Sequence, residues 1–132
     1  MKYLVSGRVR IFTIQQTNPS DTRGETWQWI QHQAAQVVIC KRRAGSVSCH
    51  FHSGKDPSKN PEQLFVATGK IKFTFLNPRT DEKKELIAKA GTALSIDPRI
   101  IHRTEVLEDA IILESRSTIF DPANPDTFSA EV

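Results

Sequence analysis

Three of the four histidines are candidate metal ligands. His50 and His52 are separated by a single residue within an alternating stretch. Alternate side chains of a β-strand point to the same face, about 6.5 to 7 Å apart along the chain, so both rings are expected on one face. His102 follows a proline-containing turn much later in the chain. Imidazole is the commonest metal ligand, so the geometry of the His50–His52 pair suits a metal ion, although His-x-His also occurs by chance.

The elements that must position these side chains are β-strands. Apolar residues recur mostly at every second position, the period of a half-buried strand, and no stretch has a convincing helical period. Short strands separated by turn signals favour a sandwich or a closed barrel. We expect strands at residues 3–11, 26–32, 36–42, 46–52, 63–68, 70–76, 84–89, 93–96, 101–107 and 110–118.

Turn signals separate these strands. Residues 18–21 predict a loop, and Gly69 predicts a tight turn or a bulge between two short strands. Residues 77–82 are polar and include Pro78, which predicts the surface loop of a hairpin. Residues 119–132 leave the strand pattern, and we expect an irregular C-terminal tail that wraps the surface or frays.

Two stretches resemble the signature motifs of the cupin superfamily. The second spans residues 91–103, opens with a glycine and ends in a proline turn before the last histidine. The first consists of Gly45, His50, His52, Glu62 and, after six further residues, Gly69. The resemblance implies an all-β fold, the cupin-type double-stranded β-helix or jelly-roll barrel. At 132 residues the chain fits one such domain, residues 1–132, because two cores would each be too small.

The resemblance also implies which residues bind the metal. Nine residues lie between the second histidine and the glutamate of the first motif, where the family usually has three or four, so Asp56 in this longer loop is an alternative ligand. Arg99, on the turn before the last histidine, is a candidate for contact with an anionic substrate at the rim of the barrel. The implied ligands are His50, His52, Glu62 and His102.

These ligands combine borderline nitrogen donors with one hard oxygen donor. They suit one divalent transition metal ion and do not choose among iron, manganese, nickel, copper and zinc. Four protein ligands leave one or two coordination positions open for water, dioxygen or a chelating substrate. We therefore expect a metal-dependent enzyme of the dioxygenase or isomerase type that acts on a small polar molecule.

Two other functions stay open, and with them the question whether the protein is an enzyme. A cupin can bind a metal or a small ligand without turnover, as a binding or sensing module, because fold does not fix function. Some cupin relatives isomerise or epimerise sugar nucleotides without metal, by means of acid–base side chains. Tyr3 is the single tyrosine and lies near the N-terminus, so this third function lacks an obvious phenolic acid.

Composition limits the partners. The 18 basic and 15 acidic side chains give a net charge of +3 and are spread along the chain, which argues against nucleic-acid binding. No apolar stretch approaches the roughly 20 residues that cross a bilayer, so no membrane partner is expected. The first residues lack the apolar run of a secretory signal, and two cysteines are too few for a disulfide framework. We therefore expect a cytoplasmic protein.

The strand around His50 and His52 also predicts a covered outer face. If both histidines face the lumen, Val47, Cys49 and Phe51 must face outward. Sizeable exposed apolar patches usually mark contacts, so we expect the N-terminal segment or a second subunit to cover this row. The sequence thus predicts a homodimer that binds a small molecule.

Overall fold

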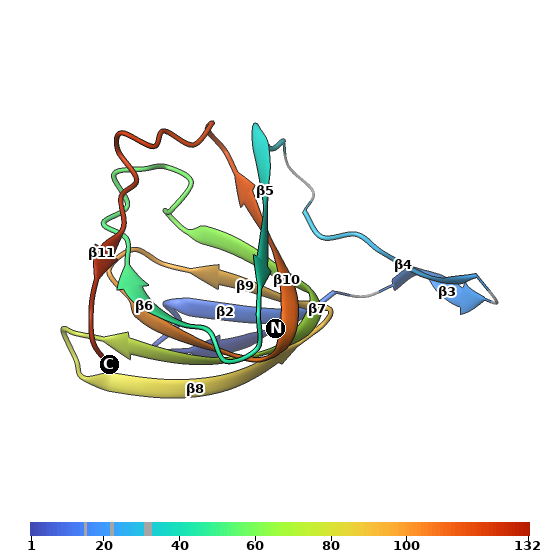
Figure 1. Cartoon of the computed structure of the whole chain (residues 1–132), viewed down its shortest axis with the longest axis horizontal. Helices are drawn as coiled ribbons and strands as arrows, with labels where there is room; N and C mark the ends of the chain where they lie inside the picture. The colour runs from blue at the N-terminus through green and yellow to red at the C-terminus, as the bar shows by residue number, and fades with distance from the viewer. Residues whose placement is uncertain (15, 22, 31–32) are drawn as a thin grey trace.

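The chain forms a curved, antiparallel nine-stranded sheet and a separate two-stranded hairpin in the computed structural model, which describes residues 1–14, 16–21, 23–30 and 33–132 (Figure 1). Within these residues every regular element is a strand, and there is no helix that could span a membrane. The strands are β1 (Lys2–Leu4), β2 (Val9–Thr13), β3 (Gln16–Asp21), β4 (Gly24–Trp27), β5 (Gln36–Arg42), β6 (Val47–Phe51), β7 (Glu62–Asn77), β8 (Glu82–Lys89), β9 (Thr92–Ile96), β10 (Ile101–Arg116) and β11 (Phe128–Ser129).

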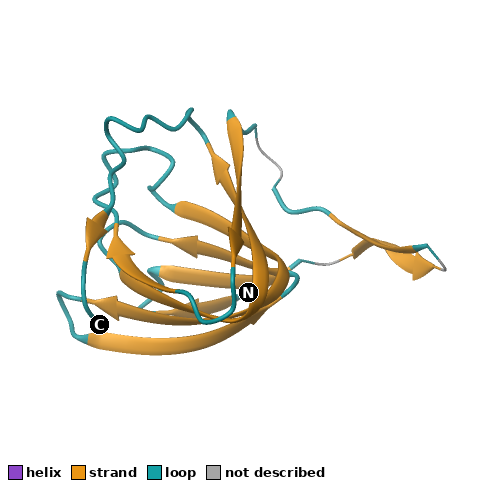
Figure 2. Ribbon diagram, in the orientation of Figure 1, coloured by secondary structure: helices purple, strands orange, loops and turns teal. Residues whose placement is uncertain are grey.

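Two strands of 16 residues each, β7 and β10, organise the barrel. They pair antiparallel from Ile101 opposite Leu76 to Ser115 opposite Gln63. On its other side β7 pairs first with β9 and then with β8, while β10 pairs first with β6 and then with β5. Each long strand thus pairs with two different strands along its length. The sheet curves around a single interior (Figure 2).

The chain passes through Gly69 without turning, so the predicted turn there is wrong and the alternative, a bulge, is right. The register of β10 with β7 shifts at three places between Val106 and Ile112, and the two shifts nearest to Gly69 put the extra residue in β10. Gly69 has a φ of +88°, and a Cβ there would lie 2.7 Å from Cα of Ala110 and closer still to the carbonyl oxygen of Asp109. The bulge lets two pairs of predicted short strands merge into β7 and β10.

The interior of the barrel is built on the alternation of β7. Ile71, Phe73 and Phe75 are fully buried, and the two phenylalanine rings stack with their centroids 5.6 Å apart. Each such side chain contributes about 1.5 to 3 kcal/mol by leaving water. Phe75 stands opposite His102 in the strand register, so the histidine side chain faces the same interior as this core.

The N-terminal part of the chain differs most from expectation. Residues 3–11 form two strands, because the chain reverses at residues 5–8, where Val5 and Ser6 have positive φ values that a period of two does not reveal. The loop expected at residues 18–21 lies in β3, which tolerates a proline because each strand of a two-stranded sheet has one unpaired side. β4 ends at Trp27, and the end predicted at His32 lies outside the described residues.

Two tryptophans attach the β3–β4 hairpin to the barrel. The ring of Trp27 meets Phe65 edge-on at 5.9 Å, and that of Trp29 stacks on Phe65 at 5.6 Å. The hairpin itself projects away from the barrel (Figure 1). Both tryptophans therefore pack against a buried residue of β7.

The C-terminal segment, and not the N-terminal one, lies against β6, where β11 pairs along the edge that β10 leaves open. Phe128 of β11 stacks on Phe51 with ring centroids 5.3 Å apart, and the backbone N–H of Ala130 donates to the carbonyl of Cys49 at 3.3 Å. Val47 stays 54% exposed. The predicted homodimer stays a prediction.

Candidate functional site

The fold brings the three predicted histidine ligands together. His50 and His102 face each other in the β6–β10 register, and His52 follows directly after β6. The ring centroids lie 4.9 Å apart for His50 and His52, 4.6 Å for His50 and His102, and 5.2 Å for His52 and His102. One nitrogen of each ring lies within 4.8 Å of the others. Three side chains from two distant segments thus form one cluster.

Two backbone carbonyls fix the proton on two of these rings. Nδ1 of His52 lies 2.8 Å from the carbonyl oxygen of Asp126, and Nδ1 of His102 lies 3.0 Å from that of Ile100. A carbonyl oxygen only accepts hydrogen bonds, so each Nδ1 carries the hydrogen. In the neutral rings both Nε2 atoms therefore present lone pairs, and both are buried without a hydrogen-bond partner among the described residues.

Glu62 returns to this cluster in spite of the long loop before it. Its Oε2 lies 2.9 Å from Nε2 of His52, and its Oε1 lies 3.6 Å from Nε2 of His102. When Nε2 is unprotonated, lone pairs face each other across these distances, which is unfavourable in a buried site. A cation between them, either a proton or a metal ion, removes this conflict.

The donor set fits a transition metal ion. With bonds of about 2.1 Å, donors at right-angled or tetrahedral positions lie about 3.0 to 3.4 Å apart, close to both distances from Glu62. The three ring nitrogens are spaced more widely and would draw together around an ion. His50, His52, Glu62 and His102 are thus the residues that could hold the metal.

Electrostatics keep this site in the protonation states that a metal needs. Burial, with help from the neighbouring His102 and His52, lowers the pKa of His50 to about 4. Burial also lowers the pKa of His102. For Glu62 burial acts in the opposite direction, but the His52 ring, the Lys59 ammonium group and His102 outweigh it and hold the pKa well below the ordinary value. At neutral pH His50 and His102 are therefore neutral and Glu62 is ionised.

A chain of buried charges extends from Glu62 away from the histidines. Lys59 Nζ lies 2.6 Å from Oε2 of Glu62 and 2.7 Å from Oε1 of Glu114. Arg116 contacts Glu114 at 3.3 Å and Asp56 at 2.7 Å. Two carboxylates raise the pKa of Lys59 although burial acts against them. Two cations thus lie among three anions, which leaves one negative charge for the site to balance.

The two remaining predicted residues lie outside the cluster. Asp56 pairs with Arg116 and is separated from the histidines by the chain of buried charges. Arg99 is exposed and borders a different hollow, together with Phe51. Because Phe51 has the opposite parity to His50 and to His52, which follows β6 directly, this hollow lies on the other face of the strand. Contact of Arg99 with a substrate stays a prediction.

Sequence reasoning missed four residues that support the site. Glu114 and Arg116 carried a signal, because they interrupt the apolar strand β10 on the parity of Ala110 and Ile112. Charged residues on a buried parity usually pair inside. Lys59 and Asp126 lie in loops, where the sequence has no periodicity that could place them.

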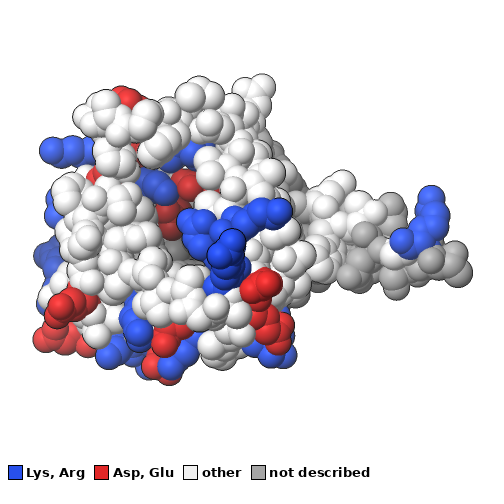
Figure 3. Space-filling model, in the orientation of Figure 1, with Lys and Arg blue, Asp and Glu red and all other residues white. Residues whose placement is uncertain are grey.

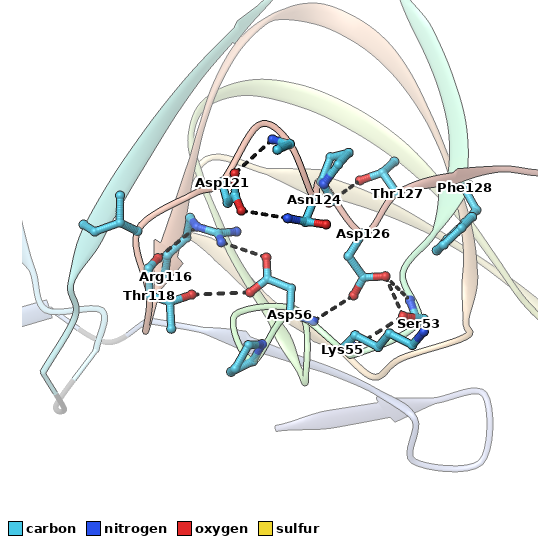
Figure 4. Close-up of a pocket in the computed structure, with 14 residues that line it drawn as sticks. Ser53, Lys55, Asp56, Arg116, Thr118, Asp121, Asn124, Asp126, Thr127 and Phe128 are labelled. Carbon is cyan, nitrogen blue, oxygen red and sulfur yellow. Dashed lines mark hydrogen bonds and ion pairs between the residues drawn. The ribbon is translucent and has the colours of Figure 1, made fainter.

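Asp126 organises the loop that leads from His52 to Glu62 (Figure 4). Its carboxylate accepts from the backbone N–H groups of Ser53, Gly54 and Asp56 and from the hydroxyl of Ser53, at 2.6 to 3.1 Å. Burial opposes ionisation, but these donors lower the pKa of Asp126 to about 2. The same residue thus shapes the loop through its side chain and orients His52 through its carbonyl.

Two hollows lie near this loop. Figure 3 shows a depression between β5 and the loop after β6, with acidic atoms at depth and basic atoms beside it. A second hollow of about 600 Å³ lies between the loop and the C-terminal tail (Figure 4). Most charged groups that border this second hollow, including Asp56, Arg116 and Asp126, are already paired with each other or with the backbone.

No family model and no curated protein matches this sequence. Solved structures do match in fold. The TDP-quinovose 3,4-ketoisomerase WlaRB from Campylobacter jejuni superposes with a TM-score of 0.71 at 14% identity, over 92% of both chains. The sugar 3,4-ketoisomerase QdtA from Thermoanaerobacterium thermosaccharolyticum gives 0.70 at 18% identity, over 92% of this chain and 87% of that one. The 3,5-epimerase RmlC from Legionella pneumophila gives 0.73 at 13% identity, over 96% and 74%.

The fold is that of a cupin. The predicted all-β class and jelly-roll barrel are therefore confirmed. At these identities the likeness establishes the fold alone, and the chemistry of this chain has to be argued from its own site.

Proposed function

We propose that this cupin is a metal-dependent enzyme of the isomerase type, in which His50, His52, Glu62 and His102 bind one divalent transition metal ion. The observation that carries the proposal is the convergence of two buried Nε2 atoms, on His52 and His102, on the carboxylate of Glu62. When bound, the ion would supply Lewis-acid polarisation of a carbonyl group on a small polar substrate.

The protein's own groups prepare the site for this ion. The carbonyls of Asp126 and Ile100 hold hydrogens on Nδ1 of His52 and His102, so that both Nε2 atoms are free to bind. Such outer partners fix ring orientation and raise ligand basicity. Lys59 balances part of the charge of Glu62 and keeps Glu114 paired, so neither carboxylate is buried alone.

An isomerase is favoured over a dioxygenase by the known chemistry on this fold. The similar solved structures are named as ketoisomerases and epimerases. Both reactions move a proton on carbon next to a carbonyl group, a step that a polarising ion also assists. Oxygen uptake by the iron or copper form would instead indicate a dioxygenase.

Metal analysis tests the ligand set. Protein prepared without added metal, and protein reloaded after chelation with iron, manganese, nickel, copper or zinc, is assayed by mass spectrometry for bound metal. We expect one ion per chain in the parent and a loss of most binding in His52→Ala and His102→Ala. Ser48→Ala, on the same strand and facing Thr104, is the matched control and should keep its metal. Unchanged metal content in both histidine variants would rule out the site.

A metal-free sugar-nucleotide isomerase or epimerase is the second candidate. The likeness to such enzymes favours it, and the buried His52–Glu62 contact offers an acid–base pair. Against it, the single tyrosine, Tyr3, is 60% exposed on β1. The test uses TDP-4-keto-6-deoxyglucose, the compound bound to a variant of the Thermoanaerobacterium enzyme. Turnover by chelated protein in proton NMR would support this candidate, whereas turnover that needs metal would support the first.

A further inference from the structure

Four separate segments meet at a hollow on the outer face of the barrel wall. It measures about 450 Å³ and is bordered by the β1–β2 turn, the end of β6, the β7–β8 turn and the β9–β10 turn. These segments contribute Arg8, Phe51, Arg79 and Arg99, together with the apolar side chains of Ile100 and Ile101. Three arginines and no carboxylate therefore border one hollow, which predicts affinity for an anion.

The positive charges of these arginines are largely without an ionic partner among the described residues. Neither Arg79 nor Arg99 has a side-chain hydrogen bond or ion pair with another described residue, and both are exposed. Arg8 does bind Asp97 at 3.0 Å, but Arg10 binds the same carboxylate. One carboxylate shared by two guanidinium groups leaves one positive charge in excess. The hollow therefore lacks an internal counter-ion of matching charge.

The backbone at Arg99 gives an independent observation. Its φ of +65° is the left-handed conformation, which costs a residue with a Cβ roughly 1 to 2 kcal/mol relative to glycine. Strained positions of this kind cluster at ligand-binding sites. The β9–β10 turn thus holds an arginine, in a conformation suited to glycine, at the edge of a cationic hollow.

The other hollows do not share this combination. In the 600 Å³ hollow beside the tail, the charged groups are mostly paired. A third hollow, near Lys41, Arg42 and Arg43, also contains Asp109, a carboxylate that binds the backbone of Ala44. The hollow at Arg99 differs from both because no carboxylate borders it.

The geometry points to a second binding site, separate from the histidine cluster, for an organic phosphate whose body is apolar or aromatic. Guanidinium groups bind phosphate oxygens in a charge-assisted, bidentate manner, and a phosphate monoester carries the charge and the three acceptor oxygens that several arginines can share. Phe51, stacked on Phe128 on one side, and Ile101 offer the wall for the body of the ligand.

A ligand bound in this hollow would affect the position of the histidine rings, because two hydrogen bonds connect the hollow to the histidine cluster. The backbone N–H of Arg99 donates to the carbonyl of His52 at 2.7 Å. The carbonyl of Ile100 accepts from Nδ1 of His102 at 3.0 Å. Residues that border the outer hollow thus hold two of the three histidines.

Titration calorimetry of the intact protein with phenyl phosphate, inorganic phosphate and benzoate tests this site without any assay of metal or turnover. We expect phenyl phosphate to bind more tightly than either other probe, with a Kd of roughly 1 mM or below. Arg99→Gly, which suits the backbone conformation, and Arg79→Ala should each weaken binding about tenfold, since a charge-assisted hydrogen bond is lost. Phe51→Leu should weaken the binding of phenyl phosphate and leave the affinity for inorganic phosphate unchanged.

Lys84→Ala is the matched control, because it removes one exposed positive charge from β8 outside the hollow. Its affinity for phenyl phosphate should stay within about twofold of the parent. The inference is overturned if phenyl phosphate fails to bind, if Arg99→Gly and Arg79→Ala bind as well as the parent, or if Lys84→Ala loses as much affinity as they do. None of these outcomes depends on whether the histidine cluster binds metal.

Discussion

The carbonyl oxygen of Asp126 lies 2.8 Å from Nδ1 of His52, 74 residues earlier in the chain. The carboxylate of the same residue binds three backbone N–H groups in the loop that carries the chain towards Glu62. One residue of the C-terminal tail therefore sets the orientation of one predicted ligand and the path to another. The tail is part of the site, although it leaves the strand pattern.

Substitution of Asp126 should weaken both the fold and metal binding. In Asp126→Ala the loop N–H groups lose a charged acceptor, and we expect a loss of about 2 kcal/mol in the free energy of unfolding and of 10- to 100-fold in metal affinity. Chemical denaturation and metal titration measure the two effects. Asp121→Ala is the control, because among the described residues the carboxylate of Asp121 binds only Ala123 and Asn124 within the tail. Equal losses in both variants would contradict a specific role for Asp126.

Metal should stay bound well below the ordinary pKa of histidine. The pKa of His50 is lowered to about 4, chiefly by burial, so protons compete with the ion at this ring only near that pH. We expect metal affinity to change little between pH 7 and pH 5 and to fall below that. Equilibrium dialysis against a series of buffers measures it. Release with a midpoint near 6.5 would show that the ring titrates as an ordinary exposed histidine.

Metal-free protein should lose stability as the pH falls from 6.5 towards 4. Below 6.5 the unfolded chain binds a proton at residue 50, whereas the folded chain resists it until about pH 4, so the proton favours unfolding. The loss attributable to His50 should reach about 2 kcal/mol, a value discounted for the partial exposure of the ring. Thermal unfolding of parent and His50→Asn across this range measures it. A slope that is equal in both proteins would contradict the assignment to His50.

Lys59 should be indispensable to the metal-free fold. Lys59→Met leaves Glu62 and Glu114 buried without their shared cation, and we expect a loss of about 3 to 5 kcal/mol in the free energy of unfolding. The double variant Lys59→Met/Glu114→Gln should recover part of it, because one buried charge is removed. Lys70→Met, whose partner Glu108 is exposed, should cost less than about 1 kcal/mol. A loss in Lys59→Met as small as that in Lys70→Met would mean that water reaches the carboxylates.

Two glycines with nearly the same φ allow the cost of backbone strain to be distinguished from the cost of a steric clash. Gly69 and Gly45 have φ values of +88° and +90°, but a Cβ at Gly69 would meet the backbone of Asp109 and Ala110, while one at Gly45 would meet nothing within 4 Å. Gly45→Ala should cost about 1 kcal/mol, the conformational term alone. Gly69→Ala should cost at least about 3 kcal/mol, because the bulge in β10 must move. Denaturant titration of both variants measures the loss in the free energy of unfolding. Equal losses would show that the bulge in β10 moves without cost to accommodate the new Cβ.

The sequence by itself determined the strand character of the chain and the parity of its key side chains. Alternation in β6 put His50 and His52 on one face, because a strand offers only two faces. In β7 the apolar residues Ile71, Phe73 and Phe75 share one parity, and all three are buried. Local patterns of this kind are visible in a single stretch of chain.

Only the tertiary structure decided which stretches meet. It joined short predicted strands across Gly69, since a bulge depends on the partner strand as much as on the glycine. It returned Glu62 to the histidines through a loop fixed by Asp126, and it directed Asp56 to Arg116 and Arg99 to the outer face. Local periodicity in the sequence does not predict contacts between distant segments. Such contacts depend on the paths of loops and on the pairing of buried charges, which become defined only when the sheet closes.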